Sequence, residues 1–154
     1  NPKYVFKLNP SNLTPIKAQP IPYPPHVERW LEGQLATMEQ IGRIVPVGPD
    51  DEAPMVTSLV LVPEGQTGQA FRICQNLILV NKRTPELHRA IQDCRRVLAR
   101  MGRKKYASLI DLKAGYHNIP FDPETNKYAI FTCHKGKYKW LRMPFGLTNA
   151  PAHF

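Results

Sequence analysis

The sequence has no apolar run of about 18 residues and no charged-then-apolar segment at its N-terminus. We therefore expect neither a membrane span nor a secretory signal. Only three cysteines occur, at positions 74, 94 and 133, and they form no CxxC pair. They are expected to be reduced, half-buried thiols of an intracellular protein, not a disulfide frame or a zinc site. The five histidines lack ligand spacing, so no structural metal is predicted.

Acidic residues are also few, with 12 Asp and Glu against 21 Lys and Arg, a formal net charge of +9 at pH 7. This excess favours a polyanionic partner, although basic proteins with other roles share it. The length of 154 residues suffices for one domain with a hydrophobic core. The chain begins without methionine and stops on Phe154 just after a loop, so we expect a fragment of a longer protein.

Proline is concentrated in residues 1–25, which predicts an extended arm because each proline fixes φ and removes a hydrogen-bond donor. Helical spacing of apolar residues predicts a helix at 26–41 and a second at 84–102, with Thr84 as its N-cap. The stripe expected to be buried on the second helix is Leu87, Ile91, Cys94, Leu98 and Met101. Runs of β-branched and apolar residues predict strands at 44–47, 55–62, 70–80, 106–111, 128–133 and 138–142.

The stretch at 106–117, YASLIDLKAGYH, combines a buried-strand pattern with an acid and a glycine-containing turn. A carboxylate at the end of a strand, here Asp111, suits a hard cation such as Mg²⁺. The alternative is an aspartate that ends a strand and caps a turn. The residues of this stretch alone leave both interpretations open.

Cationic residues lie at two further places. Arg72 follows the polar turn at 63–69, where it can reach an anion or remain an exposed strand charge. The second predicted helix and the residues after it carry a basic cluster, which either forms a solvated surface or follows a phosphate backbone. The members of this cluster are Arg95, Arg96, Arg100, Arg103, Lys104 and Lys105.

Three segments occur in a fixed order: FRIC…NKRT, LIDLKAGYHNIP and KYAIFTCHKGKYKWLRMPFGLTNAP. Together they resemble the reverse transcriptase of gypsy-like LTR retrotransposons over residues 13–154. The resemblance implies an α+β right-hand polymerase with an antiparallel sheet packed by helices and a truncated palm. It divides the chain into the Pro-rich arm at 1–25, fingers at 26–85, the start of the palm at 86–118, and fingers again at 119–154.

The resemblance also implies roles for individual residues. Asp111 would be the catalytic ligand of two Mg²⁺ ions, assisted by the backbone carbonyl of Leu112. Backbone amides of Ala114 and Gly115 would face the triphosphate. Tyr116 would lie under the incoming sugar and exclude a 2′-hydroxyl.

Two more residues complete the implied nucleotide site. Arg72 would contact the phosphates and stack near the base, since a guanidinium offers phosphate a two-pronged fork. Phe145 would line the pocket. Taken singly, Tyr116 and Phe145 could instead be core aromatics.

The sequence departs from the family pattern in three respects. The pair of adjacent aspartates expected downstream is absent from the 154 residues, so the isolated chain is expected to be inactive. The turn PEGQTGQ lacks a lysine usual for the outer phosphates. Asn76 and Ile78 stand where an aspartate and an arginine are frequent, and the joint loss leaves no lone buried charge.

The function predicted for the longer protein is RNA-directed DNA polymerisation. Its expected partners are an RNA or DNA template-primer, a deoxynucleoside triphosphate, and the remaining palm and thumb, but no membrane. The alternative is a retroelement remnant reused as a nucleic-acid-binding or protein-interaction module, and a third option is an inert degraded copy. Because the partner of strand 106–111 is missing, we expect its exposed edge to favour self-association.

Overall fold

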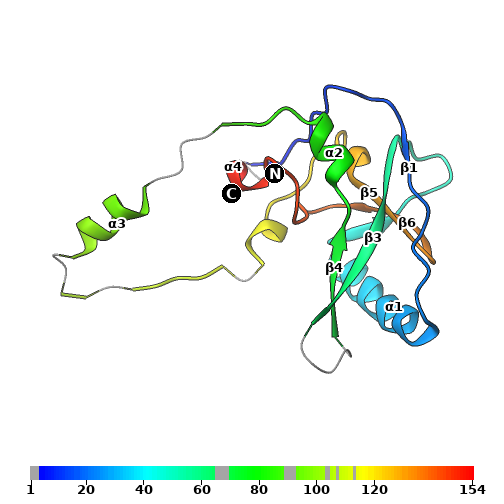
Figure 1. Ribbon diagram of the computed structural model, residues 1–154, viewed down its shortest axis with the longest axis horizontal. Coiled ribbons are helices and arrows are strands. Elements are labelled where there is room, and N and C mark those ends of the chain that lie inside the picture. Colours follow the sequence, from blue (N-terminus) through cyan, green and yellow to red (C-terminus); the bar gives the residue numbers. More distant parts are fainter. Residues whose placement is uncertain (1–3, 65–69, 89–92, 103–104, 107, 113) are drawn as a thin grey trace.

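The computed structural model describes residues 4–64, 70–88, 93–102, 105–106, 108–112 and 114–154 (Figure 1). The strands are β1 (Ile16–Lys17), β2 (Ile44–Pro46), β3 (Met55–Glu64), β4 (Ala70–Gln75), β5 (Ile130–Cys133) and β6 (Gly136–Trp140). The α-helices are α1 (Pro25–Gln40), α2 (Ile78–Arg83), α3 (Cys94–Met101) and α4 (Ala150–His153). Two 3-10 turns are η1 (Gly115–Asn118) and η2 (Asn126–Ala129).

The strands form one sheet in the order β1-β3-β5-β6-β2, with β4 paired to β3. β3 is nearly all apolar over 55–62, as a central strand must be, and it pairs parallel with both β1 and β5. The remaining pairs are antiparallel. The α+β class is thus confirmed, but the sheet is mixed and not purely antiparallel as predicted.

Helix α1 was predicted within one residue at each end, because its apolar spacing is regular and Gly42 follows it with a φ of +67°. It buries Val27, Leu31 and Leu35 in the core. The proline-rich arm is extended, as expected, and also contributes to the core. Phe6 is fully buried, and its backbone N–H donates to the carbonyl of Pro120 at 2.8 Å.

The predicted strand at 70–80 is correct only as far as Gln75, and the rest is wrong. The pairing with β3 ends there, and Ile78 begins α2, which packs Val80 into the core. Asn76 marks the change, because its side-chain oxygen accepts from the backbone N–H of Ile78 at 3.3 Å. A short apolar run such as LILV fits a strand and a buried helix equally well.

The predicted helix at 84–102 is also wrong in its first half. Thr84 ends α2 instead of starting a helix, and its hydroxyl donates to the carbonyl of Val80. α3 begins only at Cys94, after Asp93 caps the N–H of Arg95 at 2.9 Å.

The stripe expected to be buried on this second helix is exposed. Leu87, Leu98 and Met101 are 47%, 64% and 44% exposed, α3 buries no residue, and Ile91 lies outside the described residues. Cys94 is exposed as well, which corrects the expectation of a half-buried thiol, whereas Cys74 is half-buried and Cys133 buried.

The segment 105–112 is not the predicted buried strand. Its described residues are extended but unpaired, and Leu109 and Ile110 are 97% and 86% exposed. With α3 it forms an excursion that stands away from the sheet (Figure 1). No strand in the described ranges lies beside it, and an apolar strand without a neighbour has nothing against which to bury its side chains.

Candidate functional site

A cavity of about 450 Å³ lies where the excursion returns to the body of the molecule. Three stretches that are distant in the sequence form it: the end of the excursion, η1, and the C-terminal loop with α4. The lining residues are Ile110, Asp111, Leu112, Gly115, Tyr116, Phe145 and Phe154. The structure therefore brings together five residues that were predicted for the site: Asp111, Leu112, Gly115, Tyr116 and Phe145.

Ala114 supplies the turn between Asp111 and Tyr116. It adopts the left-handed conformation, with φ 51° and ψ 46°, which is uncommon for a residue with a Cβ. Its carbonyl accepts from the backbone N–H of His117 at 2.9 Å and so starts η1. The reversal lets the exposed Asp111 and the half-buried Tyr116 line the same cavity.

Aromatic rings fix the position of Tyr116. Its ring centroid lies 5.1 Å from that of Phe145 and 5.1 Å from that of Phe154, the latter edge to face. Phe154 also covers Gly115 so closely that a Cβ there would lie 2.5 Å from its Cζ atom. Sequence reasoning missed Phe154, because a contact across about 40 residues leaves no local signal.

A second cavity, of about 610 Å³, adjoins the first, and Phe145 lines both. α1 contributes Trp30, and β4 contributes Phe71 and Arg72. Trp30 and Phe71 meet edge to face with centroids 5.2 Å apart. Arg72 therefore lines a different cavity from Asp111, and Phe145 is the lining residue that the two cavities share.

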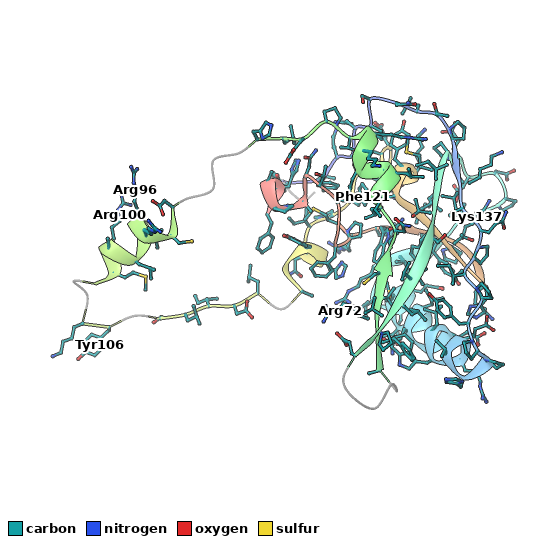
Figure 2. All side chains as sticks on the ribbon, viewed as in Figure 1. Arg72, Arg96, Arg100, Tyr106, Phe121 and Lys137 are labelled. Carbon is teal, nitrogen blue, oxygen red and sulfur yellow. The ribbon has the colours of Figure 1, made fainter. Side chains whose placement is uncertain are left out.

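Arg72 is held by a residue that the sequence did not single out. Its Nε and Nη2 atoms donate to the same carboxylate oxygen of Glu64, at 2.9 and 2.6 Å. Both side chains are exposed, and Figure 2 shows Arg72 pointing out from β4 on the side where η1 lies. The register of β3 and β4 brings these two side chains together. The contact could not be predicted from the sequence, because the register was not known.

His117 was also missed, although it directly follows Tyr116 in the sequence. Its ring stacks on Trp140 with centroids 5.7 Å apart, and its Nδ1 lies 3.1 Å from the carbonyl oxygen of Met143. Burial lowers the pKa of His117 below its ordinary value, and the charge of Arg43 lowers it further, while the bond to Met143 opposes both. The imidazole is therefore neutral over a wider pH range than a free one.

The predicted basic cluster is not gathered at either cavity. Arg95, Arg96 and Arg100 are exposed on α3, and Figure 2 shows Arg96 and Arg100 on the excursion, far from Arg72. The ammonium of Lys105 lies 5.7 Å from the ring centroid of Tyr106. The other two members, Arg103 and Lys104, lie outside the described residues.

The site offers one carboxylate to a metal ion. Among the described residues, no group of three or more His, Cys, Asp or Glu side chains could hold a cation. Asp111 and the carbonyl of Leu112 are oxygen ligands of the type that Mg²⁺ prefers, but alone they do not complete a site. Nor is any helix in the described part of the chain long and apolar enough to cross a membrane.

Curated relatives of this chain include polyproteins of transposons. It is 32% identical over 96% of its length to the retrovirus-related Pol polyprotein from transposon opus of Drosophila melanogaster. It is 29% identical over 96% to that from transposon 297 and 40% identical over 38% to that from transposon gypsy, both of the same organism. The chain spans only 15%, 14% and 6% of these three relatives.

Solved structures share the fold. The prototype foamy virus protease-reverse transcriptase (CSH mutant) superposes with a TM-score of 0.77 at 24% identity, over 97% of this chain and 19% of that one. The foamy viral enzyme in complex with an RNA/DNA hybrid also gives a TM-score of 0.77, at 21% identity and the same coverages. These likenesses confirm the expected polymerase fold.

The family model described as reverse transcriptase (RNA-dependent DNA polymerase) matches residues 67–154, more than half of the chain. This span holds all three segments, at 71–84, 109–120 and 127–151, whose order carried the resemblance to LTR retrotransposon enzymes. The resemblance is confirmed, and the chain belongs to the reverse transcriptase family, as part of such a domain.

Proposed function

We propose that this chain supplies the nucleotide side of the active site of an RNA-directed DNA polymerase within a longer Pol polyprotein. The observation that carries the proposal is the cavity in which Asp111, Gly115, Tyr116 and Phe145 converge. An acid, a glycine turn and two rings in one hollow suit a metal-bound triphosphate on one side and a sugar on the other. Membership of the family supports this assignment.

Asp111 and the Leu112 carbonyl would contribute ligands to Mg²⁺, and the other carboxylates would come from outside the described residues. When bound, the metal supplies charge stabilisation to the phosphoryl oxygens. Backbone amides of Ala114 and Gly115 would face the triphosphate, and Arg72 would contact it from β4. A guanidinium suits that role because its fork matches two phosphate oxygens.

Tyr116 would act as the sugar filter. Its half-buried ring lies between those of Phe145 and Phe154, which are 55% and 61% exposed. Steric rejection of a 2′-hydroxyl requires the ring to stay in place, and the two ring contacts favour this position. Phe145 would form the part of the wall shared with the second cavity.

The remaining assignments concern the organisation of the longer protein. We propose fingers at 26–85 and 119–154, the start of the palm at 86–118, and the arm at 1–25 in an intracellular polyprotein. Its substrates would be a template-primer and deoxynucleoside triphosphates. The exposed segment 108–112 would be covered by the rest of the palm or, in the isolated chain, by a second copy.

Primer extension on an RNA template tests this proposal. The 154-residue chain alone should extend nothing, because one carboxylate cannot hold two metal ions. A longer polypeptide that contains the chain should extend the primer, and Asp111→Asn should abolish extension while the thermal unfolding midpoint stays unchanged. Undiminished extension by Asp111→Asn would overturn the assignment.

A binding module is the second candidate, and the exposed arginines of α3 favour it. It predicts sequence-independent binding of RNA or DNA that weakens steeply as salt rises. Filter binding at two salt concentrations, with Arg96→Gln and Arg100→Gln together, measures the contribution of α3. Binding that is unaffected by salt or by these substitutions excludes the module.

A further inference from the structure

The strands β3 and β4 place an acid against the guanidinium that is proposed to receive phosphate. In their register Val62 pairs with Arg72 and Glu64 pairs with Ala70, so Glu64 and Arg72 are diagonal neighbours on one face. One Glu64 carboxylate oxygen accepts from both Nε and Nη2 of Arg72, at 2.9 and 2.6 Å. The contact therefore occupies one complete edge of the guanidinium.

That edge is one of the two through which a guanidinium can hold a pair of phosphate oxygens, the other being Nη1 with Nη2. Arginine binds carboxylate and phosphate through the same parallel N–H groups, so the two anions exclude each other at one edge. The sequence from 63 to 72, PEGQTGQAFR, contains no other acid and no other cation. Within the segment 63–72, Glu64 therefore offsets the charge of the single cation, Arg72.

The contact is also easily exchanged. The side chains of Arg72 and Glu64 are 70% and 45% exposed, and water screens an ion pair at such a surface. An arriving polyphosphate carries several negative charges and three or more acceptor oxygens, so it competes well for the guanidinium. To bind the Nε/Nη2 edge, the polyphosphate must displace the carboxylate, and at either edge it lies near the negative charge of Glu64.

We propose that Glu64 is a resident anion that occupies the Arg72 fork until a polyphosphate displaces it, and so weakens polyphosphate binding. The inference rests on the proposed function, because it assumes that Arg72 receives phosphate. It assigns Glu64 a role that deepens that function: a positioning residue that tunes affinity for the incoming nucleotide. The carboxylate keeps the guanidinium oriented when the site is empty.

The test is a titration of this chain with inorganic tripolyphosphate. ¹⁵N NMR of the Arg72 Nε–H group reports directly on what occupies the fork. Glu64→Gln should bind tripolyphosphate about two- to five-fold more tightly than the wild type, the range expected for an exposed ion pair. Glu64→Asp keeps the charge but shortens the reach, so its affinity should fall between the two.

Glu52→Gln is the matched control, because it removes the same charge from another exposed ion pair, with Lys127. It should leave the affinity unchanged. In an Arg72→Ala background, Glu64→Gln should have no more effect than the control. Both acids are exposed, so the variants retain the fold.

The outcomes separate the two proposals. Equal or weaker binding by Glu64→Gln, with the Arg72 signal still responding to tripolyphosphate, overturns the role of Glu64 and leaves that of Arg72 intact. If the Arg72 signal does not respond to tripolyphosphate in any variant, the roles of both Glu64 and Arg72 are overturned. If Glu52→Gln raises the affinity for tripolyphosphate as much as Glu64→Gln does, the effect is one of net charge, and the inference is also overturned.

Discussion

Gly115 shows how tightly single residues shape the nucleotide cavity. The Phe154 ring lies where a side chain would begin, and the same ring meets Tyr116 edge to face. A change of one methyl group at position 115 therefore reaches the proposed sugar filter through Phe154. What opposes a side chain at position 115 is the close approach of the Phe154 ring and not the backbone, since Gly115 does not adopt a positive φ.

Gly115→Ala should accordingly cost only about 0.5–1 kcal/mol of unfolding free energy, because the new Cβ meets the far end of the Phe154 ring, which is 61% exposed and can move away. In a Phe154→Ala background the same substitution should cost almost nothing, since the obstacle is gone. Urea denaturation of the four proteins in this double-mutant cycle measures the coupling. Equal costs in both backgrounds would contradict the packing described.

His117 should make stability depend on pH. Its pKa is lowered in the folded chain, so the unfolded chain takes up the proton first as pH falls. The free energy of unfolding should therefore decrease as pH drops through the unfolded-state value of 6.5 toward the lowered folded value. His117→Gln should show a shallower decrease between about pH 7 and pH 5, measured by urea denaturation. Parallel curves for the two proteins would refute this.

Which residues form the site was easier to predict from the sequence than how they contact one another. Asp111, Tyr116 and Phe145 were selected because the segments that hold them resemble those of the reverse transcriptase family, and the structure gathers them in one cavity. Glu64 and Phe154 were not foreseen. Their roles arise from strand register and from packing across distant segments, and neither leaves a periodic pattern in the sequence.

Among the elements, β4 is tied to the sheet through Gln75. Its side-chain nitrogen donates to Thr57 Oγ1 at 2.8 Å and lies 3.2 and 3.1 Å from the carbonyl oxygens of Ala129 and Ile130. Its oxygen accepts from the indole N–H of Trp140 at 2.7 Å. One amide thus joins β3, β4, η2, β5 and β6 at the lining of the larger cavity.

Gln75→Leu should destabilise the chain by about 1–3 kcal/mol, because the buried indole N–H of Trp140 loses its acceptor. Gln40→Leu, at the exposed end of α1, is the control and should change stability by less than about 0.5 kcal/mol. Thermal and chemical unfolding give both values. A cost for Gln75→Leu no greater than that of the control would show that the network contributes nothing.

Helices and strands were predicted correctly where the tertiary contacts agree with the local pattern of apolar residues. α1 and the β3–β4 hairpin were expected, since their apolar spacing matches the face that the core needs. The strand at 106–111 did not form, and the helix predicted at 84–102 formed only in its second half, as α3. Their apolar side chains find no surface to cover in the described structure, and an apolar pattern yields a packed element only when a partner is present.

The whole molecule combines a packed sheet with an unpacked excursion (Figure 1). The arm packs against the C-terminal part of the chain: the hydroxyl of Tyr4 lies 2.6 Å from Nδ1 of His153, and Phe6 packs edge to face on Phe121. The excursion instead exposes apolar side chains. Such a surface favours association with another chain.

Leu109→Ser combined with Ile110→Ser should reduce self-association without loss of stability, because these side chains are 97% and 86% exposed. Sedimentation equilibrium should show a lower average mass than for the wild type. Leu13→Ser, at an exposed leucine of the arm, should leave the mass unchanged. A wild-type chain that is monomeric throughout would contradict this expectation.

Sugar discrimination by a longer polypeptide that contains this chain tests the nucleotide site most directly. The ratio of deoxyribonucleotide to ribonucleotide incorporation should be retained in Tyr116→Phe, which keeps the ring. It should fall at least about ten-fold in Tyr116→Ala, because the wall between Phe145 and Phe154 is opened. An unchanged ratio in Tyr116→Ala would show that the cavity does not hold the sugar of the incoming nucleotide.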